Sequence, residues 1–354
     1  MVEIDVKDKK ILYHLDIDSR QSFNNIGKKV GLTRDNVAYR VKRLQEKAII
    51  INFRTHISLG ALNYLYTRTY YNFQNINPTI KKEIIDHFVN SKEVIYVAWL
   101  EGVYDLVVVT PIRDSLKLNS FFQQAQLRFG DYIAEQTSAI YLVNWWYDLS
   151  FLLDKKVEKR EVIRGIDERA LPKLFTSPRA LKIDSLDFKI LQTMAGNARI
   201  PTTEMAKELH STVIQIHHRV KKLIDNGIIG GFGITIDLSK VGYRLYHINI
   251  NLKKLTKRFG IIDYIKFNPH LYCIEKAIGN AADLELEFYL ENIEQLHQIM
   301  EDIYLKFPES IKNFKYFSFF KPNKYSLMPH IESKSPYYSF SKTIKGYNIT
   351  VSLD

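Results

Sequence analysis

Apolar residues change their spacing in the same order in two parts of the chain. In the first part they recur every three or four residues, at Ile11, Leu12, Leu15, Ile26, Val30, Val37, Val41 and Leu44. That spacing places them on one face of each of three short helices. Segments 49–54 and 228–236 are rich in β-branched and apolar residues, which predicts a short strand or wing after each set of helices.

Start and stop signals support these helices. Thr33 is a candidate N-cap for the third helix of the first part, and Thr212 with Gln215 three residues later is typical of a capping box in the second. Gly31 lies where a turn is expected, and Gly227 lies where a C-terminal cap is expected. Three helices followed by a strand are the order of a winged helix-turn-helix module.

The stretch after each wing alternates strand and helix in the order β-α-β-β-α-β. The expected strands are 64–73, 93–101, 105–111, 138–146, 245–252, 272–278, 284–289 and 312–320, and the expected helices are 78–90, 115–129, 258–267 and 293–307. This order makes a ferredoxin-like antiparallel sheet with two helices on one face. The fold class is therefore α+β.

The two parts are copies of one module. Asp8-Lys9-Lys10-Ile11-Leu12 reappears as Asp187-Phe188-Lys189-Ile190-Leu191, an offset of 179 residues that then holds without gaps. Over the 46 positions from 8 to 53, 14 residues are identical in the second copy, which indicates duplication or fusion. The expected organisation is a winged helix-turn-helix at 1–60, a ferredoxin-like regulatory domain at 61–154, a basic linker at 155–182, the second pair of domains at 183–242 and 243–325, and a C-terminal tail at 326–354.

Composition points to a class of partner. The 354 residues are 46% hydrophobic and 25% charged, which excludes a disordered or fibrous chain. The net charge of +11 favours a polyanion, either nucleic acid or an anionic membrane surface. The excess is concentrated in residues 1–60 and in the linker, at +5 each, whereas residues 183–242 carry only +1.

The single cysteine and the apolar stretches limit the cellular compartments in which we expect the protein. Cys273 alone excludes an internal disulfide framework and a four-cysteine metal site, and it suits a reducing cytosol. Residues 1–5 lack the pattern of a secretory signal, and the apolar stretch 94–110 is interrupted by Glu101 and Asp105. We therefore expect a cytoplasmic protein with no membrane partner, no metal and no cofactor.

The third helix of the first copy is a candidate DNA-recognition helix. With Val37, Val41 and Leu44 facing the core, the polar residues on its other faces are Arg34, Asn36, Tyr39, Arg40 and Arg43. Arg suits guanine, Asn suits adenine, and Tyr can hold phosphate. The alternative is a solvated helix face, because basic residues are common near helix C-termini.

The equivalent helix of the second copy carries less charge. Its exposed set is Val213, Gln215, His217, His218, Arg219 and Lys222, after the cap at Thr212. Adjacent His217 and His218 point about 100° apart, and no cysteine or carboxylate completes a metal site around them. We expect weaker DNA contact from this copy, through Thr212, Gln215, His218, Arg219 and Lys222.

This order of motifs resembles the Lrp/AsnC (feast/famine) family of bacterial and archaeal transcription regulators. The first copy matches the family pattern with Asp8, Ile11-Leu12, Arg20, Gly31-Leu32-Thr33 and residues 37–44, and departs where Ala48 replaces a glycine. The second copy matches with Asp187, Arg199, residues 216–223 and Gly227-Ile228-Ile229, but His210-Ser211-Thr212 replaces the glycine turn. The resemblance implies sequence-specific binding of double-stranded DNA at the nucleoid, with Thr33 among the contacts.

The resemblance also implies a regulatory domain that dimerises through its sheet and binds an amino acid or a related metabolite. The family's effector loop has the pattern Gly-x-Tyr-Asp, which Gly102, Tyr104 and Asp105 match; the second copy keeps only Gly279 and Asp283. The alternative is that Gly102 and Asp105 simply make a hairpin turn. With two copies in one chain, the sheets are expected to pair as an intrachain pseudo-dimer, and further homo-oligomerisation stays open.

Two other functions compete with the regulator. The same scaffold resembles subunits of siroheme decarboxylase, which carry His-Asn-Tyr followed by Arg and His near the second and third strands; this chain has Val97-Ala98-Trp99-Leu100-Glu101 there. No catalytic triad, glycine-rich phosphate loop or metal cluster is evident in the sequence, so we expect no enzyme activity. A metabolite sensor or assembly protein without DNA affinity is the third class.

Overall fold

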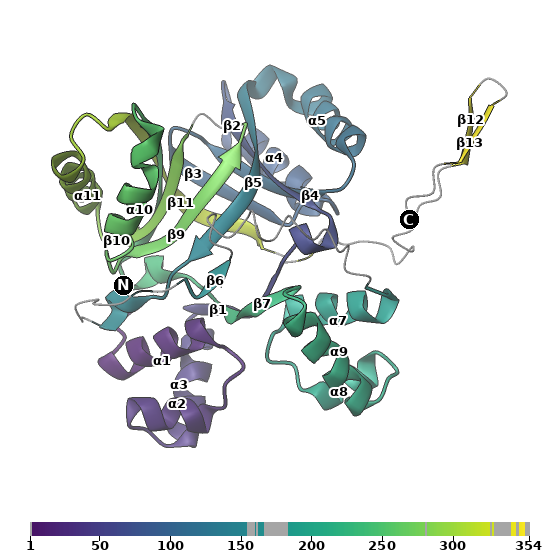
Figure 1. The fold of residues 1–354 in the computed structure, drawn as a ribbon, viewed down its shortest axis with the longest axis vertical. Helices are drawn as coiled ribbons and strands as arrows, with labels where there is room; N and C mark the ends of the chain where they lie inside the picture. The colour runs from purple at the N-terminus through teal and green to yellow at the C-terminus, as the bar shows by residue number, and fades with distance from the viewer. Residues whose placement is uncertain are drawn as a thin grey trace.

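Each copy begins with a bundle of three helices and a strand. The computed structural model describes residues 2–153, 160, 162–165, 183–279, 282–325, 328, 341–344 and 347–350. The first bundle consists of α1 (Val6–Ile17), α2 (Phe23–Val30) and α3 (Arg34–Glu46), followed by β1 (Ile50–Ile57). The second consists of α7 (Ser185–Gly196), α8 (Thr202–Glu208) and α9 (Val213–Asp225), followed by β7 (Ile229–Ile236). Both bundles lie at the same end of the molecule (Figure 1).

The N-terminal caps agree with the sequence in position and differ in one detail. The Thr33 and Thr212 hydroxyls accept hydrogen bonds from the backbone N–H groups of Asn36 and Gln215, at 3.3 and 3.2 Å. The expected capping box at Thr212 is wrong, because the Gln215 side chain accepts a hydrogen bond from the Ser211 hydroxyl at 2.6 Å. Reciprocal capping boxes occur instead at the first helix of each bundle, between Asp5 and Asp8 and between Asp184 and Asp187.

Four turn positions in the two helix bundles adopt left-handed backbone. Gly31 and Gly227 do so at φ 68°, as glycines that end a helix. The positions that match them in the other copy hold side chains in the same conformation, with Ala48 at φ 50° and His210 at φ 49°. Each helix bundle therefore has one unstrained and one strained turn at these positions.

We expect glycine to stabilise both strained turns. Ala48→Gly and His210→Gly should each raise the free energy of unfolding by about 1 kcal/mol, since removing Cβ relieves the left-handed conformation and outweighs the added entropy of the unfolded chain. Chemical denaturation checks the change. The matched control is Gly227→Ala, which should lower the free energy of unfolding by a similar amount; a loss of stability in Ala48→Gly would contradict the prediction.

The rest of each copy is a four-stranded sheet with two helices. In the first copy these are β2 (Leu65–Phe73), α4 (Pro78–Asn90), β3 (Tyr96–Gly102), β4 (Leu106–Ile112), α5 (Ser115–Phe129) and β5 (Ile133–Trp146). In the second they are β8 (Arg244–Leu252), α10 (Arg258–Ile265), β9 (Leu271–Ile278), β10 (Leu284–Leu290), α11 (Ile293–Lys306) and β11 (Ile311–Tyr325). The expected ferredoxin-like order is confirmed in both copies.

Shorter elements connect or follow these units. Five 3-10 helices are described, at Gly60–Leu62, Gly130–Tyr132, Ser150–Leu153, Leu238–Val241 and Leu255–Lys257. Strand β6 (Arg164–Gly165) pairs with the end of β5, and β12 (Ser341–Ile344) pairs with β13 (Tyr347–Thr350). Most of the linker and of the tail lies outside the described residues.

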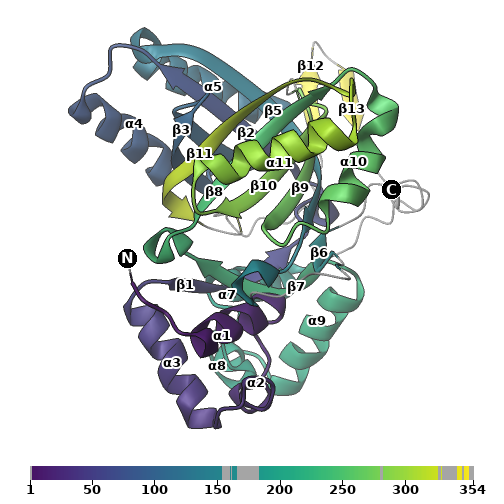
Figure 2. The ribbon, with the colours of Figure 1, turned by 90° about the vertical axis from the view of Figure 1, so that its left-hand side faces the viewer.

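The two sheets close into one ring. Within each copy the strand order is 4-1-3-2, as β5-β2-β4-β3 and β11-β8-β10-β9. Strand β3 of the first copy pairs antiparallel with β11 of the second, and β5 pairs antiparallel with β9. Eight strands therefore form a continuous hydrogen-bonded circuit whose two seams each join one copy to the other, with helices α4 and α5 on one outer side and α10 and α11 on the other (Figure 2).

The ring has an apolar outer face and a mixed inner face. On the first copy the outer face packs Tyr71, Val97, Leu106 and Val108 against Phe88 and Phe121 of the helices. On the second, Ile248, Ile250, Leu284 and Leu286 pack against Ile261, Leu296 and Ile303. Alternate residues of the same strands face the interior, where the two sheets meet.

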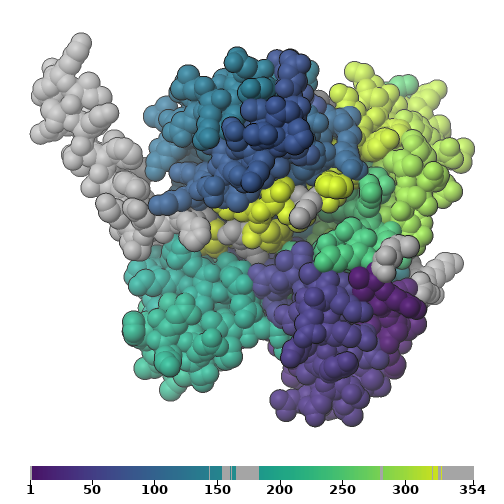
Figure 3. All heavy atoms as spheres, turned by 180° about the vertical axis from the view of Figure 1, so that it is seen from behind, coloured from purple at the N-terminus to yellow at the C-terminus, as the bar shows by residue number. Residues whose placement is uncertain are grey.

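A two-stranded ribbon ties the helix bundles together. The segments expected to be separate wings pair with each other, β1 with β7, with Phe53 opposite Ile234. The bundles are also joined directly, because Arg20 donates to the Ala198 carbonyl at 2.6 Å and the Ala198 amide donates to the Phe53 carbonyl at 2.9 Å. The space-filling view shows the two bundles as separate lobes below the ring (Figure 3).

Candidate nucleic-acid interface

Helix α3 presents polar side chains at its amino end. Thr33, Arg34, Asn36 and Tyr39 are exposed, and 67% of the Tyr39 side chain is accessible to solvent. Val37, Val41 and Leu44 are buried, as the periodicity predicts. A helix anchored by one apolar face and offering Arg, Asn and Tyr on the others has the geometry for insertion into a major groove.

Two arginines assigned to the same surface are held by carboxylates. Arg40 Nη1 lies 2.7 Å from Asp5 Oδ2 and 2.8 Å from Asp8 Oδ1, and Arg43 Nη2 also pairs with Asp8. Arg40 and Arg43 therefore fasten α3 to the capped first turn of α1. A structural bracing role is what this geometry provides, and DNA contact by these two residues stays a prediction.

The second copy repeats this brace. Arg219 Nη1 lies 2.6 Å from Asp184 Oδ2 and 2.8 Å from Asp187 Oδ1, which fastens α9 to α7. Thr212, Gln215, His218 and Lys222 are exposed, so the assigned side chains other than Arg219 are accessible. The bundles are thus matched in architecture and differ in what their third helices present.

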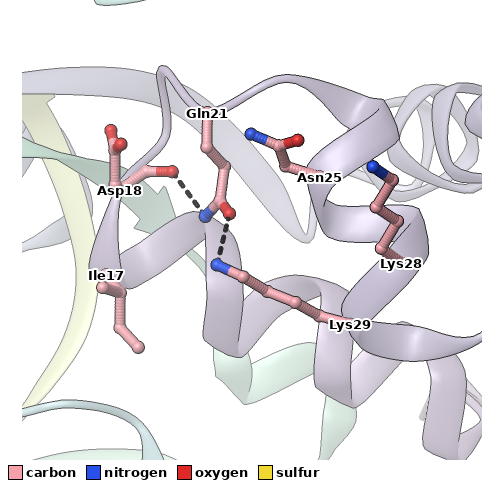
Figure 4. A pocket seen from close by; sticks show the side chains of 6 residues that line it. All are labelled: Ile17, Asp18, Gln21, Asn25, Lys28 and Lys29. Atoms are coloured by element: carbon pink, nitrogen blue, oxygen red, sulfur yellow. Dashed lines mark hydrogen bonds between the residues drawn. The ribbon is translucent and has the colours of Figure 1, made fainter.

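A surface pocket of about 330 Å³ adds positive charge beside α2. Its lining is Ile17, Asp18, Gln21, Asn25, Lys28 and Lys29 (Figure 4). The Gln21 amide group donates to the Asp18 carbonyl at 2.9 Å and accepts from Lys29 Nζ at 3.0 Å. Lys28 is exposed, and the helix before a recognition helix crosses the phosphate backbone in this motif. Lys28 was not among the candidate residues, although the 179-residue offset aligns it with Lys207.

The turn expected to bind an effector is part of a seam between the copies. Gly102 has φ 132°, and a Cβ atom there would lie 2.7 Å from the Tyr316 carbonyl oxygen of β11. The Asp105 carboxylate accepts a hydrogen bond from the Phe73 amide at 2.8 Å, and the Tyr104 ring stacks on Tyr70 at 4.6 Å between centroids. These contacts supply a structural reason for the Gly-x-Tyr-Asp pattern.

The second copy has equivalent contacts at the other seam. Gly279 has φ 84°, and a Cβ atom there would lie 3.0 Å from the Ser138 carbonyl oxygen of β5. The Asp283 carboxylate accepts a hydrogen bond from the Leu252 amide at 2.7 Å. The glycine and the aspartate kept in both copies thus have the same structural partners in both, whether or not an effector binds.

The ring interior holds a buried ionic network that sequence reasoning missed. Arg68 of the first copy makes a bidentate pair with Glu275 of the second, at 2.6 and 2.5 Å. The Tyr141 hydroxyl donates to Glu285 at 2.7 Å, and His247 Nδ1 lies 3.3 Å from Glu287 Oε1. Three buried glutamates are therefore opposed by one arginine and one histidine.

The carboxylates set the charge state of His247. Burial alone lowers the pKa of this imidazole, but hydrogen bonds to Glu285 and Glu287 and the charges of both raise the pKa to about 9. Burial also raises the pKa of Glu275 above its usual range, although the Arg68 guanidinium opposes that effect. His247 is thus a cation at neutral pH, stacked on Phe317 at 4.6 Å.

The same groups include donors that a metal ion accepts. Ligand atoms of His247, Glu275 and Glu285 lie within 4.8 Å of one another, as do those of Cys273, Glu275 and Glu287. Arg68 already occupies both oxygens of Glu275 and lies 3.7 Å from Glu287. The arrangement therefore supplies its own cations, and we assign it a role in holding the copies together.

Two helix-turn-helix bundles carried by one ring of ferredoxin-like sheets define a tandem helix-turn-helix protein. The AsnC-type helix-turn-helix domain matches residues 4–45, and the winged helix-turn-helix DNA-binding domain matches residues 183–229. The chain is 36% identical over 122 residues to the HTH-type transcriptional regulator LrpA of Bacillus subtilis, covering 34% of this chain and 89% of that protein. It is 34% identical over 119 residues to the regulatory protein AsnC of Haemophilus influenzae, covering 33% of this chain and 79% of that protein. The chain belongs to the Lrp/AsnC family of transcription regulators.

A solved structure matches both copies together. The siroheme decarboxylase NirDL aligns over 90% of this chain and 92% of its own, with a TM-score of 0.58 and 12% identity. At that identity the likeness shows the fold alone. None of the helices in the described part of the chain has both the length and the apolar character needed to cross a bilayer.

Proposed function

We propose that this chain is a sequence-specific DNA-binding regulator without enzyme activity that acts in the cytoplasm, at the nucleoid. The observation that carries the proposal is α3, whose buried Val37, Val41 and Leu44 leave Arg34 and Asn36 exposed at its amino end. Arg recognises guanine and Asn recognises adenine through paired hydrogen bonds in the major groove. The local charge of +5 over residues 1–60 adds attraction to phosphate.

We propose further that the two copies act as an intrachain pseudo-dimer of the family's homodimer. The two seams β3–β11 and β5–β9 support this, because each joins one sheet to the other. Helices α3 and α9 carry different exposed residues, so the two half-sites of the operator should differ in sequence. A footprint with perfect two-fold symmetry would contradict this arrangement.

The effector that we propose for this pseudo-dimer is an amino acid or a related small metabolite. Support comes from the Gly102 to Asp105 turn, where Tyr104 is half-buried beside a seam between the copies. A ligand that binds there would alter the contact between the sheets that carry the two DNA-binding bundles. Its effect on DNA affinity is the quantity to measure.

The deciding experiment is selection of bound DNA from a random pool at fixed salt, with and without a mixture of amino acids. Against the selected site, Arg34→Ala and Asn36→Ala should each weaken binding by roughly 5- to 100-fold and relax preference at one or two bases, because each removes a base-edge contact. The matched control is Gln45→Ala, an exposed residue nearer the carboxyl end of α3, which should change affinity little.

Other outcomes discriminate between the classes of function. Failure to enrich any sequence, together with binding of an amino acid, would favour a metabolite sensor. Equal loss of affinity for every sequence in Asn36→Ala would show that this residue contacts only the backbone. Circular dichroism of each variant establishes that the bundle remains folded.

A further inference from the structure

Helix α9 begins with exposed aliphatic side chains where α3 begins with charged ones. Ile214 is 83% exposed and Val213 is 44% exposed. In the 179-residue register they occupy the positions of Asp35 and Arg34. Exposed aliphatic residues at the amino end of a helix add little to the core of the bundle, and contact with a ligand would remove their apolar surface from water.

Ile214 is separate from the core of its own bundle. The buried residues of α9 are Ile216 and Leu223, and Val220 packs beside them. Ile214, His217, His218 and Lys221 follow the helical spacing of a single face, and all four are exposed. Ile214 therefore belongs to the solvent face that continues into basic residues.

The polar residue nearest to them has a local partner. Gln215 accepts a hydrogen bond from the Ser211 hydroxyl at 2.6 Å, and its backbone amide is used in the Thr212 cap. The amino end of α9 thus offers two aliphatic side chains and one internally bonded amide. In the major groove, the apolar group that suits such a surface is the C5-methyl group of thymine.

We propose that α9 recognises its half-site chiefly through thymine methyl groups contacted by Val213 and Ile214. The inference rests on the proposed DNA-binding function and specifies it for the second copy. DNA is favoured over a protein partner because Lys221 and Lys222 are exposed on the same helix, in position for phosphates, and because the matching face of α3 carries base-edge donors. The half-site of the first copy is recognised by hydrogen bonds, and that of the second by methyl groups.

The test uses the full chain and its selected operator. An iron chelate attached to Asn226→Cys at the end of α9 identifies the half-site of the second copy by local cleavage, since the native Cys273 is buried and the new thiol is exposed. Thymidines in that half-site are then replaced one at a time by deoxyuridine, which removes the methyl group and keeps every hydrogen-bonding group. Replacing one contacted thymidine should lower the affinity of the chain for the operator about four-fold, which is the effect of one buried methyl group.

Protein variants test whether the loss of affinity caused by deoxyuridine depends on Val213 and Ile214. In a Val213→Ala, Ile214→Ala double variant, deoxyuridine should no longer reduce affinity, whereas Asp35→Ala at the matching position of α3 should leave the deoxyuridine effect unchanged. A specific operator that tolerates deoxyuridine at every position would overturn the inference and leave the proposed function standing. Absence of any specific DNA binding would overturn both.

A different result is expected if Val213 and Ile214 bind a second copy of this chain instead of DNA. Sedimentation without DNA would show self-association that the double variant abolishes, and that outcome would also overturn thymine recognition. An unchanged sedimentation coefficient with a deoxyuridine-dependent affinity supports it.

Discussion

Replacing Arg68 with methionine should lower the free energy of unfolding by about 3–5 kcal/mol, because the change leaves the buried Glu275 without the guanidinium that pairs with both of its oxygens. Arg68 is 10% exposed and makes two hydrogen bonds to Glu275 of the other copy. Denaturant unfolding followed by circular dichroism measures the loss. A double variant with Glu275→Gln should recover part of the lost stability, because it removes the carboxylate that Arg68→Met leaves unpaired.

The chain provides a matched control for this pair. Arg244 and Glu101 also join the two copies, at 2.9 Å, but their side chains are 51% and 48% exposed. Arg244→Met should cost less than about 1 kcal/mol, since solvent screens the pair. Similar losses in Arg68→Met and Arg244→Met would contradict the importance of burial.

The second large effect concerns pH. The pKa of His247 is about 9 in the folded chain against 6.5 for the free side chain, so the folded state holds this proton more tightly. The resulting stabilisation is fully present below pH 6.5 and is lost as pH rises through 9, and it amounts to at most about 3 kcal/mol. The free energy of unfolding should therefore fall between pH 6.5 and 9.

A variant isolates the histidine from other titrating groups. His247→Gln lacks the titrating proton and should show a flatter change in the free energy of unfolding over that range, whatever its absolute stability. Deprotonation of His247 leaves Glu285 and Glu287 without their shared cation in the ring interior. An unchanged pH slope in His247→Gln would show that other groups dominate the dependence.

The sequence was sufficient for most of the secondary structure. Helices α4 and α5 have the predicted bounds, because Pro78 and Ser115 begin clear helical patterns after strong caps. The three-helix bundles were predicted from the spacing of Ile11, Leu12 and their equivalents. Local signals of this kind depend on neighbours in the chain and are visible without a partner.

The contacts between the two copies could not be predicted from the sequence patterns. In β10, Glu285 and Glu287 alternate with Leu284, Leu286 and Phe288, a pattern usually produced by one solvent-facing side. Here the charged side faces the other sheet, so both glutamates are buried. Likewise β1 and β7 have the composition of a wing, but their partners are supplied by the other copy.

The candidate site was predicted unevenly for the same reason. Arg34, Asn36 and Tyr39 are exposed as expected. Helical periodicity places Tyr39 opposite Val37, Val41 and Leu44, whereas Arg34 lies in the first turn of α3. Arg40 and Arg219 match each other in sequence, and only the structure shows that each pairs with an aspartate cap 35 residues earlier. Gly102 and Gly279 have their structural reason in the seams, which no local pattern reveals.

Closure of the ring within one chain also removes the dependence of its assembly on protein concentration. A family homodimer must first assemble, so its active form depends on subunit concentration through mass action. Here both seams and the β1–β7 ribbon form intramolecularly, at a fixed effective concentration. The ring that carries the two bundles with α3 and α9 therefore stays complete on dilution, and a single molecule has the same architecture as many.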